Sequence, residues 1–241
     1  MDIKVLYEDN HIIVVLKPQN VPTQADESGD LDMLSAVKQY VKEKYAKPGE
    51  AYVGLVHRLD RPTGGVMIFA RTSKAAARLS ASIKEGELEK KYLAVVTGTL
   101  RDKSGELVNY LLKNPKTNNV SVVPATTKGA KKAVLKYNVL EVAEDTSMVD
   151  ISLLTGRSHQ IRVQMNYQGC PLYADVRYGG DKVLGKGDNL ALWAYEIKFV
   201  HPVTHKKMTF RVYPPVEDKP WSDFHVDKYL SISKPIADME Y

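Results

Sequence analysis

The sequence predicts an α+β fold built on a mixed, largely antiparallel sheet that is flanked by helices. Two observations favour this class: predicted strands outnumber predicted helices, and many neighbouring strands are joined by short turns, as in hairpins. A chain of 241 residues is long enough for one sizeable core, and no stretch resembles a flexible linker between independent domains. We therefore expect a single domain over residues 1–241, with a C-terminal segment, 216–241, docked on it.

The first part of the chain combines β-branched runs with two stretches of helical periodicity. Glycine, proline and capping residues separate these segments. The predicted elements are a hairpin of residues 5–7 and 12–16 that ends at Lys17-Pro18, a helix from Leu31 to Tyr45 behind Asp30, a buried strand over 66–70, and a helix capped at Thr72 or Ser73, with Ala76, Leu79 and Ile83 inward, that ends at Gly86.

The remaining part is richer in predicted strands. Apolar alternation and turn residues mark most of its boundaries. The predicted elements are a strand over 92–99, an antiparallel pair of 133–142 and 148–154, a helix from Gly156-Arg157 to Gly169, two strands over 190–200 and 207–213 around the turn at His201-Pro202, and a docked C-terminal segment carrying Trp221, Phe224, Tyr229 and Leu230.

Charge and cysteine content limit the partners and the compartment. The net charge of +5 and the pI of about 9.0 suit a polyanion such as RNA, although the basic runs 128–132 and 205–207 are also typical of solvated faces. A single cysteine, Cys170, excludes an internal disulfide and fits a reducing compartment. No long apolar run or secretory signal is visible, so we expect a cytoplasmic protein with no membrane partner.

The segment from Leu55 to Phe69 is the most informative part of the chain. It places one carboxylate, Asp60, between two arginines, Arg58 and Arg61, just before a tight turn and an apolar strand. Pro62 and the Gly64-Gly65 pair favour a sharp loop, because glycine adopts backbone angles that other residues avoid. The flanking guanidinium groups can keep a carboxylate ionised and can hold phosphate. Asp60 is therefore the first candidate for a catalytic residue.

The motif HRLDRPTGG at residues 57–65 resembles the catalytic motif of the RluA-type RNA pseudouridine synthases. Three further segments resemble motifs of this family in the same order, and together they cover about residues 17–215. They are Lys17-Pro18 with residues 19–23, where Asn20 replaces a glycine common in the family; residues 89–98; and residues 153–163, with 169–172 and 175–179 downstream.

The resemblance implies the pseudouridine synthase fold, with a central RNA-binding cleft and an isomerase activity on uridine in structured ribosomal or transfer RNA. Because the first motif begins at Lys17, we expect a catalytic domain without a preceding S4-type RNA-binding domain. The reaction requires neither redox equivalents nor hydrolytic water, so no cofactor is expected. RNA is the expected partner; we expect no obligate protein partner, and a monomer.

The resemblance also implies a role for individual residues. Asp60 is the essential carboxylate, acting either on the anomeric carbon or on a ribose proton, and Arg162 orients it through an ion pair. Tyr92 stacks on the uracil, and its hydroxyl takes part in removing the last proton. Arg58 fills the space left when the target nucleotide leaves its stack. We further expect RNA contacts from Arg61, Arg157 and His159; Leu154 or Ile161 could line the uracil pocket or belong to the core.

Other constellations are less informative. His57, His159, His201 and His205 lack a recognisable metal-ligand spacing, so no metal is expected. An alternative function is a non-catalytic RNA-binding protein on the same scaffold, but such a protein would not require Asp60, Tyr92 and Arg162 together. A glycosidic hydrolase usually works with two carboxylates, and the motifs contain one.

Overall fold

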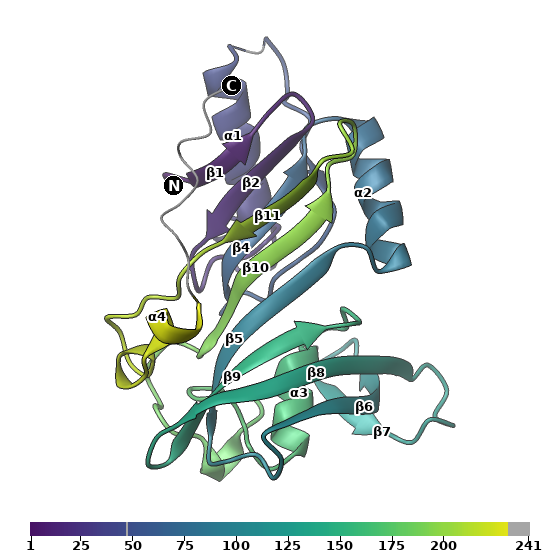
Figure 1. Ribbon diagram of the computed structural model, residues 1–241. Helices are drawn as coiled ribbons and strands as arrows, with labels where there is room; N and C mark the ends of the chain where they lie inside the picture. The colour runs from purple at the N-terminus through teal and green to yellow at the C-terminus, as the bar shows by residue number, and fades with distance from the viewer. Residues whose placement is uncertain (47, 231–241) are drawn as a thin grey trace. The chain divides into compact units, whose positions relative to one another are not determined.

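The computed structural model describes residues 1–46 and 48–230, which form two compact units (Figure 1). Unit 1 contains residues 1–46, 48–89 and 194–212, and unit 2 contains residues 90–193 and 213–230. Each unit is described in turn. Of the predicted C-terminal segment, residues 231–241 lie outside the described residues.

Unit 1 is built on antiparallel strand pairs. Strand β2 pairs with β1 on one side and β4 on the other, β3 also pairs with β4, and β10 lies next to β4 and pairs with β11 (Figure 1). The predicted N-terminal hairpin and buried strand are therefore confirmed. The bounds are β1 Lys4–Glu8, β2 Ile12–Lys17, β3 Gly54–Leu55, β4 Gly64–Ala70, β10 Leu192–Val200, of which unit 1 contains residues 194–200, and β11 Lys207–Arg211.

Both predicted helices of unit 1 form, and side chains cap each of them. Helix α1, Met33–Lys44, begins after Asp32, whose carboxylate accepts from the Ser35 N–H at 3.0 Å. Helix α2, Ser73–Glu85, begins after Thr72 and ends at Gly86, which adopts φ = 80°. Ala75 and Leu79 of α2 pack into a core formed by Ile12 and Val14 of β2, Val66, Ile68 and Ala70 of β4, Leu88, and Ile197 and Phe199 of β10.

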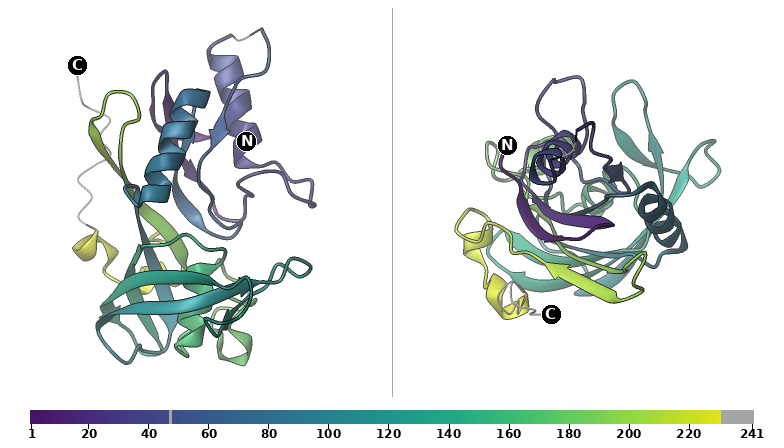
Figure 2. Two further views of the ribbon diagram at one scale, coloured as in Figure 1. Left: turned by 90° about the vertical axis from the view of Figure 1, so that its right-hand side faces the viewer. Right: turned by 90° about the horizontal axis from the view of Figure 1, so that it is seen from above.

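Unit 2 is also built on antiparallel neighbours, in the order β5-β9-β8-β6-β7. The predicted pair of long strands is confirmed as β8 and β9, whereas β6 was not expected from the sequence. Helix α3 contacts β6 and β7 (Figure 2). The bounds are β5 Glu89–Thr97, β6 Ser104–Lys113, β7 Val120–Val123, β8 Lys131–Val142, β9 Thr146–Leu153 and α3 Gln160–Tyr167.

Helix α3 begins at Gln160, later than the expected start at Gly156-Arg157. His159 adopts φ = 50°, which a right-handed helix cannot contain. The side-chain oxygen of Gln160 accepts from the Arg157 N–H at 3.0 Å and from the Thr155 hydroxyl at 2.8 Å, so the preceding residues are held as a turn. Ser158 therefore lies in this turn and not on a helical face with Arg162.

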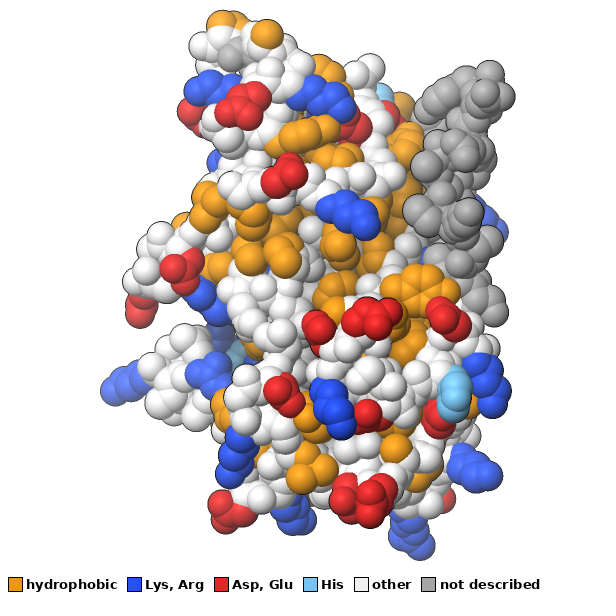
Figure 3. All heavy atoms as spheres, turned by 90° about the vertical axis from the view of Figure 1, so that its left-hand side faces the viewer, with side chains coloured by type: hydrophobic (Ala, Val, Ile, Leu, Met, Phe, Trp, Pro, Cys, Tyr) orange, Lys and Arg blue, Asp and Glu red, His pale blue; other side chains and the backbone are white. Residues whose placement is uncertain are grey.

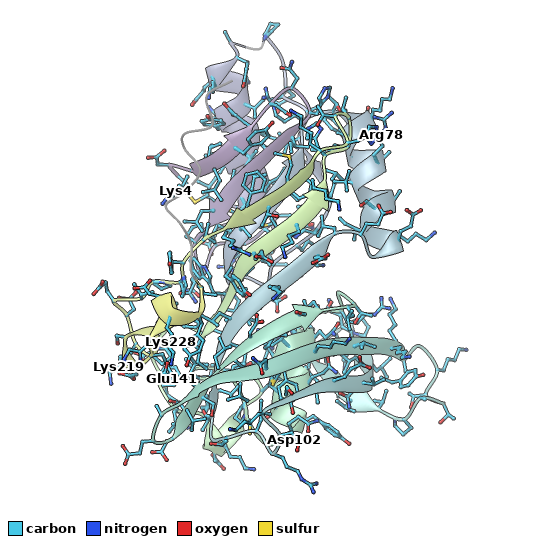
Figure 4. The ribbon with its side chains drawn as sticks, in the orientation of Figure 1. Lys4, Arg78, Asp102, Glu141, Lys219 and Lys228 are labelled. Carbon is cyan, nitrogen blue, oxygen red and sulfur yellow. The ribbon has the colours of Figure 1, made fainter. Side chains whose placement is uncertain are left out.

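The C-terminal part of unit 2 contains only short helical turns. Trp221, Phe224 and Leu230 are buried. Glu141 of β8 accepts from both the backbone N–H of His225, at 3.1 Å, and its ring, at 2.7 Å, and so fastens this segment to the sheet; Glu141 is labelled in Figure 4. The turns are η1 Gly180–Lys182, η2 Trp221–Asp223 and α4 Val226–Tyr229.

Candidate active site

Asp60 lies on a short loop of unit 1, residues 56–63, between β3 and β4. Its side chain is half-buried, while the next residues toward β4 are held in a turn by the Thr63 N–H, which donates to the Asp60 carbonyl at 3.0 Å. On the other side, buried Leu59 anchors the loop: the Thr23 hydroxyl donates to the Leu59 carbonyl at 2.7 Å. His57 accepts the backbone N–H of Ile68 at 3.0 Å. The carboxylate is thus presented by a loop that is fastened on both sides.

The side chain of Lys17 supports the backbone of this loop. Its side chain is fully buried, and its ammonium group donates to the carbonyls of Arg61 at 2.9 Å, Thr63 at 2.6 Å and Pro18 at 3.1 Å. Burial lowers the pKa of Lys17 to about 7; the Asp60 carboxylate acts in the opposite direction, and the Arg61 charge adds to the lowering. Gln19 contributes another bond, to the Pro62 carbonyl at 3.1 Å. The Lys-Pro motif therefore holds the backbone of the Asp60 loop.

Gly65 explains why the motif ends in glycine. The residue adopts φ = 128°, and a Cβ atom there would lie 2.2 Å from the carbonyl oxygen of Ala194 and 2.6 Å from its nitrogen. Only glycine allows β10 to approach the start of β4 this closely.

The two arginines that flank Asp60 have different surroundings. Arg61 directs its guanidinium to Asp26 at 3.0 Å and to Asp30 at 2.6 Å, so both partners come from the exposed loop before α1. Arg58 is exposed, and within residues 1–46 and 48–230 no ion pair or hydrogen bond of its side chain is found. In this state Arg61 is neutralised by the protein itself, whereas Arg58 is available to a ligand.

Tyr92 lies on β5 of unit 2, paired in register with Ile151 of β9. Its side chain is buried, at 6% exposure, so the surrounding packing fixes the orientation of its ring. An apolar run continues beyond it from Leu93 to Val96. A side chain on a buried strand is held more rigidly than one on a surface loop, so β5 fixes the position of Tyr92.

Arg162 projects from α3 into a bidentate ion pair with Asp175. The Nε and Nη2 groups donate to the two carboxylate oxygens at 2.8 and 2.6 Å, and both residues are buried. The ring of Tyr178 lies 5.1 Å from the guanidinium carbon. Asp175 in turn accepts the backbone N–H groups of Arg177 and Tyr178. The guanidinium plane is therefore fixed by two parallel bonds.

The role of Asp175 was not predicted from the sequence. Asp175 lies downstream of the third motif, where the sequence alone indicates no partner for it. The sequence does contain one signal. Asp175 is the only acidic residue between Asp150 and Asp181, and it follows Arg162, which lies in a short predicted helix.

Comparison with known proteins identifies the protein family of this chain. Residues 11–167 match the family model of RNA pseudouridylate synthase, which covers more than half of the chain. The chain belongs to this family. It is 34% identical over 212 residues to RNA pseudouridine synthase YjbO of Bacillus subtilis (strain 168), covering 86% of this chain and 70% of the relative. It is 33% identical over 221 residues to ribosomal large subunit pseudouridine synthase C of Escherichia coli O157:H7, covering 89% of this chain and 66% of the relative.

The fold agrees with this assignment. The human protein RNA Pseudouridylate Synthase Domain Containing 4 superimposes with a TM-score of 0.75 at 21% identity, covering 96% of this chain and 94% of that one. The predicted pseudouridine synthase fold is therefore confirmed. The chain spans less than two thirds of the length of some curated relatives, such as the 65% covered in synthase C of Buchnera aphidicola subsp. Schizaphis graminum (strain Sg).

The remaining residues predicted for RNA contact lie at the start of α3. Arg157 is exposed and donates from Nε to the Lys132 carbonyl at 2.9 Å. His159 is hydrogen-bonded through Nδ1 to the Tyr178 hydroxyl at 2.5 Å. Of the two residues considered for the uracil pocket, Ile161 is buried at 3% exposure, whereas Leu154 is 54% exposed and is not a core residue.

The structure therefore groups the family residues by unit. Asp60 lies with Arg58, Arg61 and Lys17 in unit 1, and Tyr92 lies with Arg162 in unit 2. The predicted ion pair of Asp60 with Arg162 joins the two units and stays a prediction, as does the RNA-binding cleft. In residues 1–46 and 48–230 no group of three or more His, Cys, Asp or Glu residues is placed to hold a metal ion, and no helix there is long and apolar enough to span a membrane.

Proposed function

We propose that this protein is an RNA pseudouridine synthase that isomerises specific uridines in structured ribosomal or transfer RNA in the cytoplasm. The observation that carries this proposal is the Asp60 loop, which matches the catalytic motif and is held in place by Lys17, Thr23 and Gly65. The family match and the relatives named ribosomal large subunit pseudouridine synthase C support it. RNA is the proposed partner, and the protein acts as a monomer without a cofactor.

The proposed reaction exchanges one bond of the ribose for another. The bond from the ribose C1′ to N1 of uracil breaks, the base turns while it stays bound, and C1′ joins C5; the hydrogen of C5 is then released as a proton, and N1 gains one. The carboxylate of Asp60 acts on the ribose, either by attacking C1′ or by removing a ribose proton. Both routes require an ionised carboxylate.

Arg162 is the proposed orienting partner of Asp60. Because Asp175 holds the Nε edge of the guanidinium, the group cannot rotate, and its outer edge can serve a second carboxylate. A planar donor fixed in this way sets the rotation of the Asp60 carboxylate as well as supplying a charge. Arg162 is therefore a positioning residue in this proposal, and Asp175 supports it.

Tyr92 and Arg58 are the proposed contacts of the target nucleotide. The glycosidic bond cannot be reached inside stacked RNA, and extruding the nucleotide costs a few kcal/mol. Exposed Arg58, two residues before Asp60, is placed to enter the vacated stack. The ring of Tyr92 then packs on the uracil, and its hydroxyl helps to remove the proton from C5.

The test uses RNA labelled with tritium at C5 of uridine. Purified protein should release tritium from unmodified ribosomal or transfer RNA without releasing free uracil, and ribosomal or transfer RNA from a deletion strain should lack at least one pseudouridine. Asp60→Asn should abolish tritium release while RNA binding stays within about tenfold, or 1.4 kcal/mol. Full activity of this variant would overturn the mechanism, and free uracil would favour a hydrolase. RNA binding by the unmodified protein without tritium release from either RNA would favour the non-catalytic alternative.

A further inference from the structure

Strand β5 carries two neighbouring lysines that face opposite sides. Successive side chains of a strand point to opposite faces, so Lys90 shares a face with Tyr92, while Lys91 points to the other. The register supports this alternation, because Lys90 pairs with Leu153 and Tyr92 with Ile151, two residues apart on β9. Lys90 therefore lies beside the residue that we propose to contact the target base.

The two lysines differ in their partners. Lys91 forms an ion pair with Asp150 at 3.4 Å, and its charge is compensated within the protein. Lys90 forms no ion pair or hydrogen bond with any of the residues 1–46 and 48–230, although it is half-buried. Burial lowers the pKa of Lys90, and no neighbouring charge offsets this effect. Keeping a partly buried ammonium group without an anion costs free energy.

The end of the Lys90 side chain lies near the turn before α3. A Cβ atom at Gly156 would lie 3.3 Å from the Lys90 nitrogen, so the ammonium group lies close to Gly156. This turn contains exposed Gly156, Arg157 and Ser158, and the ammonium is thus next to an open surface rather than inside the core. A ligand that approaches this exposed turn can reach it.

We propose that Lys90 binds a backbone phosphate of the RNA, next to the nucleotide that Tyr92 contacts. This inference rests on the proposed function, and it adds a binding residue for the substrate. A phosphate oxygen supplies the negative charge that the protein does not supply at this position. The uracil base is neutral and would leave the ammonium uncompensated, so the phosphate is the part of RNA that fits it best.

The experiment measures binding of unmodified ribosomal RNA, transcribed in vitro, at several salt concentrations. Each phosphate contact contributes about 0.7 to 0.9 to the slope of log affinity against log salt. Lys90→Met keeps the length of the side chain and removes the charge, so the slope should become shallower by about that amount. Lys90→Arg should restore the slope, and Lys91→Met, whose charge is already paired, is the matched control and should leave it unchanged.

The outcomes separate this inference from the proposed function. An unchanged slope for Lys90→Met, whether or not affinity falls, would overturn the phosphate contact. So would equal changes for Lys90→Met and Lys91→Met, since both would then report only general charge. The thermal midpoint of Lys90→Met is measured in parallel, and if this variant does not fold, Lys90→Gln replaces it. Tritium release by the unmodified protein is measured separately; its absence would refute the isomerase, while the slopes would still decide whether Lys90 contacts RNA.

Discussion

At the scale of the residue, buried charged groups hold the candidate site residues in place. Lys17 holds the backbone below Asp60 with three N–H donors, and Asp175 holds the guanidinium of Arg162. An ammonium group has three donors and therefore satisfies three carbonyls, whereas a neutral amine has only two. Each support fixes a neighbour: Lys17 holds the loop that carries Asp60, and Asp175 holds the plane of the Arg162 guanidinium.

The lowered pKa of Lys17 leads to a pH-dependent stability. The pKa is about 7 in the folded protein and 10.5 for an ordinary lysine, so between these values the unfolded chain binds a proton that the folded protein has released. The free energy of unfolding should therefore rise with pH over this window relative to Lys17→Met, by at most about 1.4 kcal/mol per unit. Below pH 7 both states hold the proton, and the difference should be constant.

Urea unfolding of the two proteins from about pH 6 to pH 10 measures this difference, because contributions from other groups cancel. Parallel curves over the whole range would show that Lys17 keeps its ordinary pKa after folding.

Lys17→Met should also be less active, since the carbonyls of Arg61 and Thr63 lose a buried donor and the Asp60 loop loosens.

Tyr92 allows the stacking and the proton-transfer roles to be separated. Tyr92→Phe keeps the buried ring and removes only the hydroxyl, so RNA affinity should stay within a fewfold. If the hydroxyl helps to remove the proton from C5, the rate of tritium release at saturating RNA should fall by about a hundredfold or more. A Tyr92→Phe protein with an unchanged rate would assign the residue to packing and stacking alone.

Residue types in a motif predicted the candidate site better than they predicted its internal contacts. The sequence HRLDRPTGG was enough to select Asp60, but it could not show that Arg61 turns to Asp26 and Asp30, because those acids come from a loop about thirty residues earlier. The Arg162–Asp175 pair was missed for a similar reason. A guanidinium selects among several carboxylates by three-dimensional proximity, which spacing along the chain does not determine.

At the scale of the element, the junction of β3, the Asp60 loop and β4 depends on one glycine. The backbone of Gly65 lies against Ala194 of β10, and this close approach fixes where β4 begins and therefore where the preceding loop stands. Local propensity does not reveal such a contact, because β10 lies far away in sequence. The turn-forming character of Gly64-Gly65 was predicted, but the reason for the glycine at 65 is tertiary.

Replacing Gly65 by alanine should destabilise the protein strongly. The positive φ angle alone costs about 1–2 kcal/mol for a residue with a Cβ atom, and a clash with backbone atoms adds about 1–3 kcal/mol. Gly86→Ala is the matched control, because Gly86 also has a positive φ angle but a Cβ atom there meets nothing within 4 Å. Chemical unfolding of both variants should show the larger loss for Gly65→Ala. Equal losses would mean that β10 moves away at little cost.

The elements that sequence reasoning predicted well are those with local signals. Helix α2 was bounded correctly by Thr72 and Gly86, since a side-chain cap and a left-handed glycine act within one turn. Helix α3 begins later than expected, because His159 adopts a positive φ angle and the Gln160 side chain holds the preceding residues as a turn. Strand β6 was missed; most of its side chains are exposed or half-buried, so its apolar pattern is weak.

At the scale of the whole molecule, the excess of basic residues is the property most relevant to RNA. The net charge is +5, yet Figure 3 shows a face on which acidic and basic side chains are interspersed. Arg61 and Lys91 are paired with acids of the protein, whereas Arg58 and Lys90 are not paired within the described residues. Pairing within the protein thus distinguishes basic residues that total charge treats as equal, so we expect their positions to matter for RNA binding.

RNA affinity should consequently fall steeply with salt, with a slope that counts the cations in contact with phosphates rather than all the basic residues. Each phosphate contact lowers the affinity about threefold when salt rises from about 50 to about 200 mM, so several contacts give a loss of tenfold to a hundredfold. Filter binding or fluorescence anisotropy over this range gives the slope. Lys219→Gln, which removes a lysine that already pairs with Asp223 at 3.4 Å, provides the control for total charge and should leave the slope unchanged. A slope near zero would show that phosphates contribute little to binding. If Lys219→Gln and Lys90→Met made the slope shallower by the same amount, the net charge, and not individual positions, would govern RNA binding.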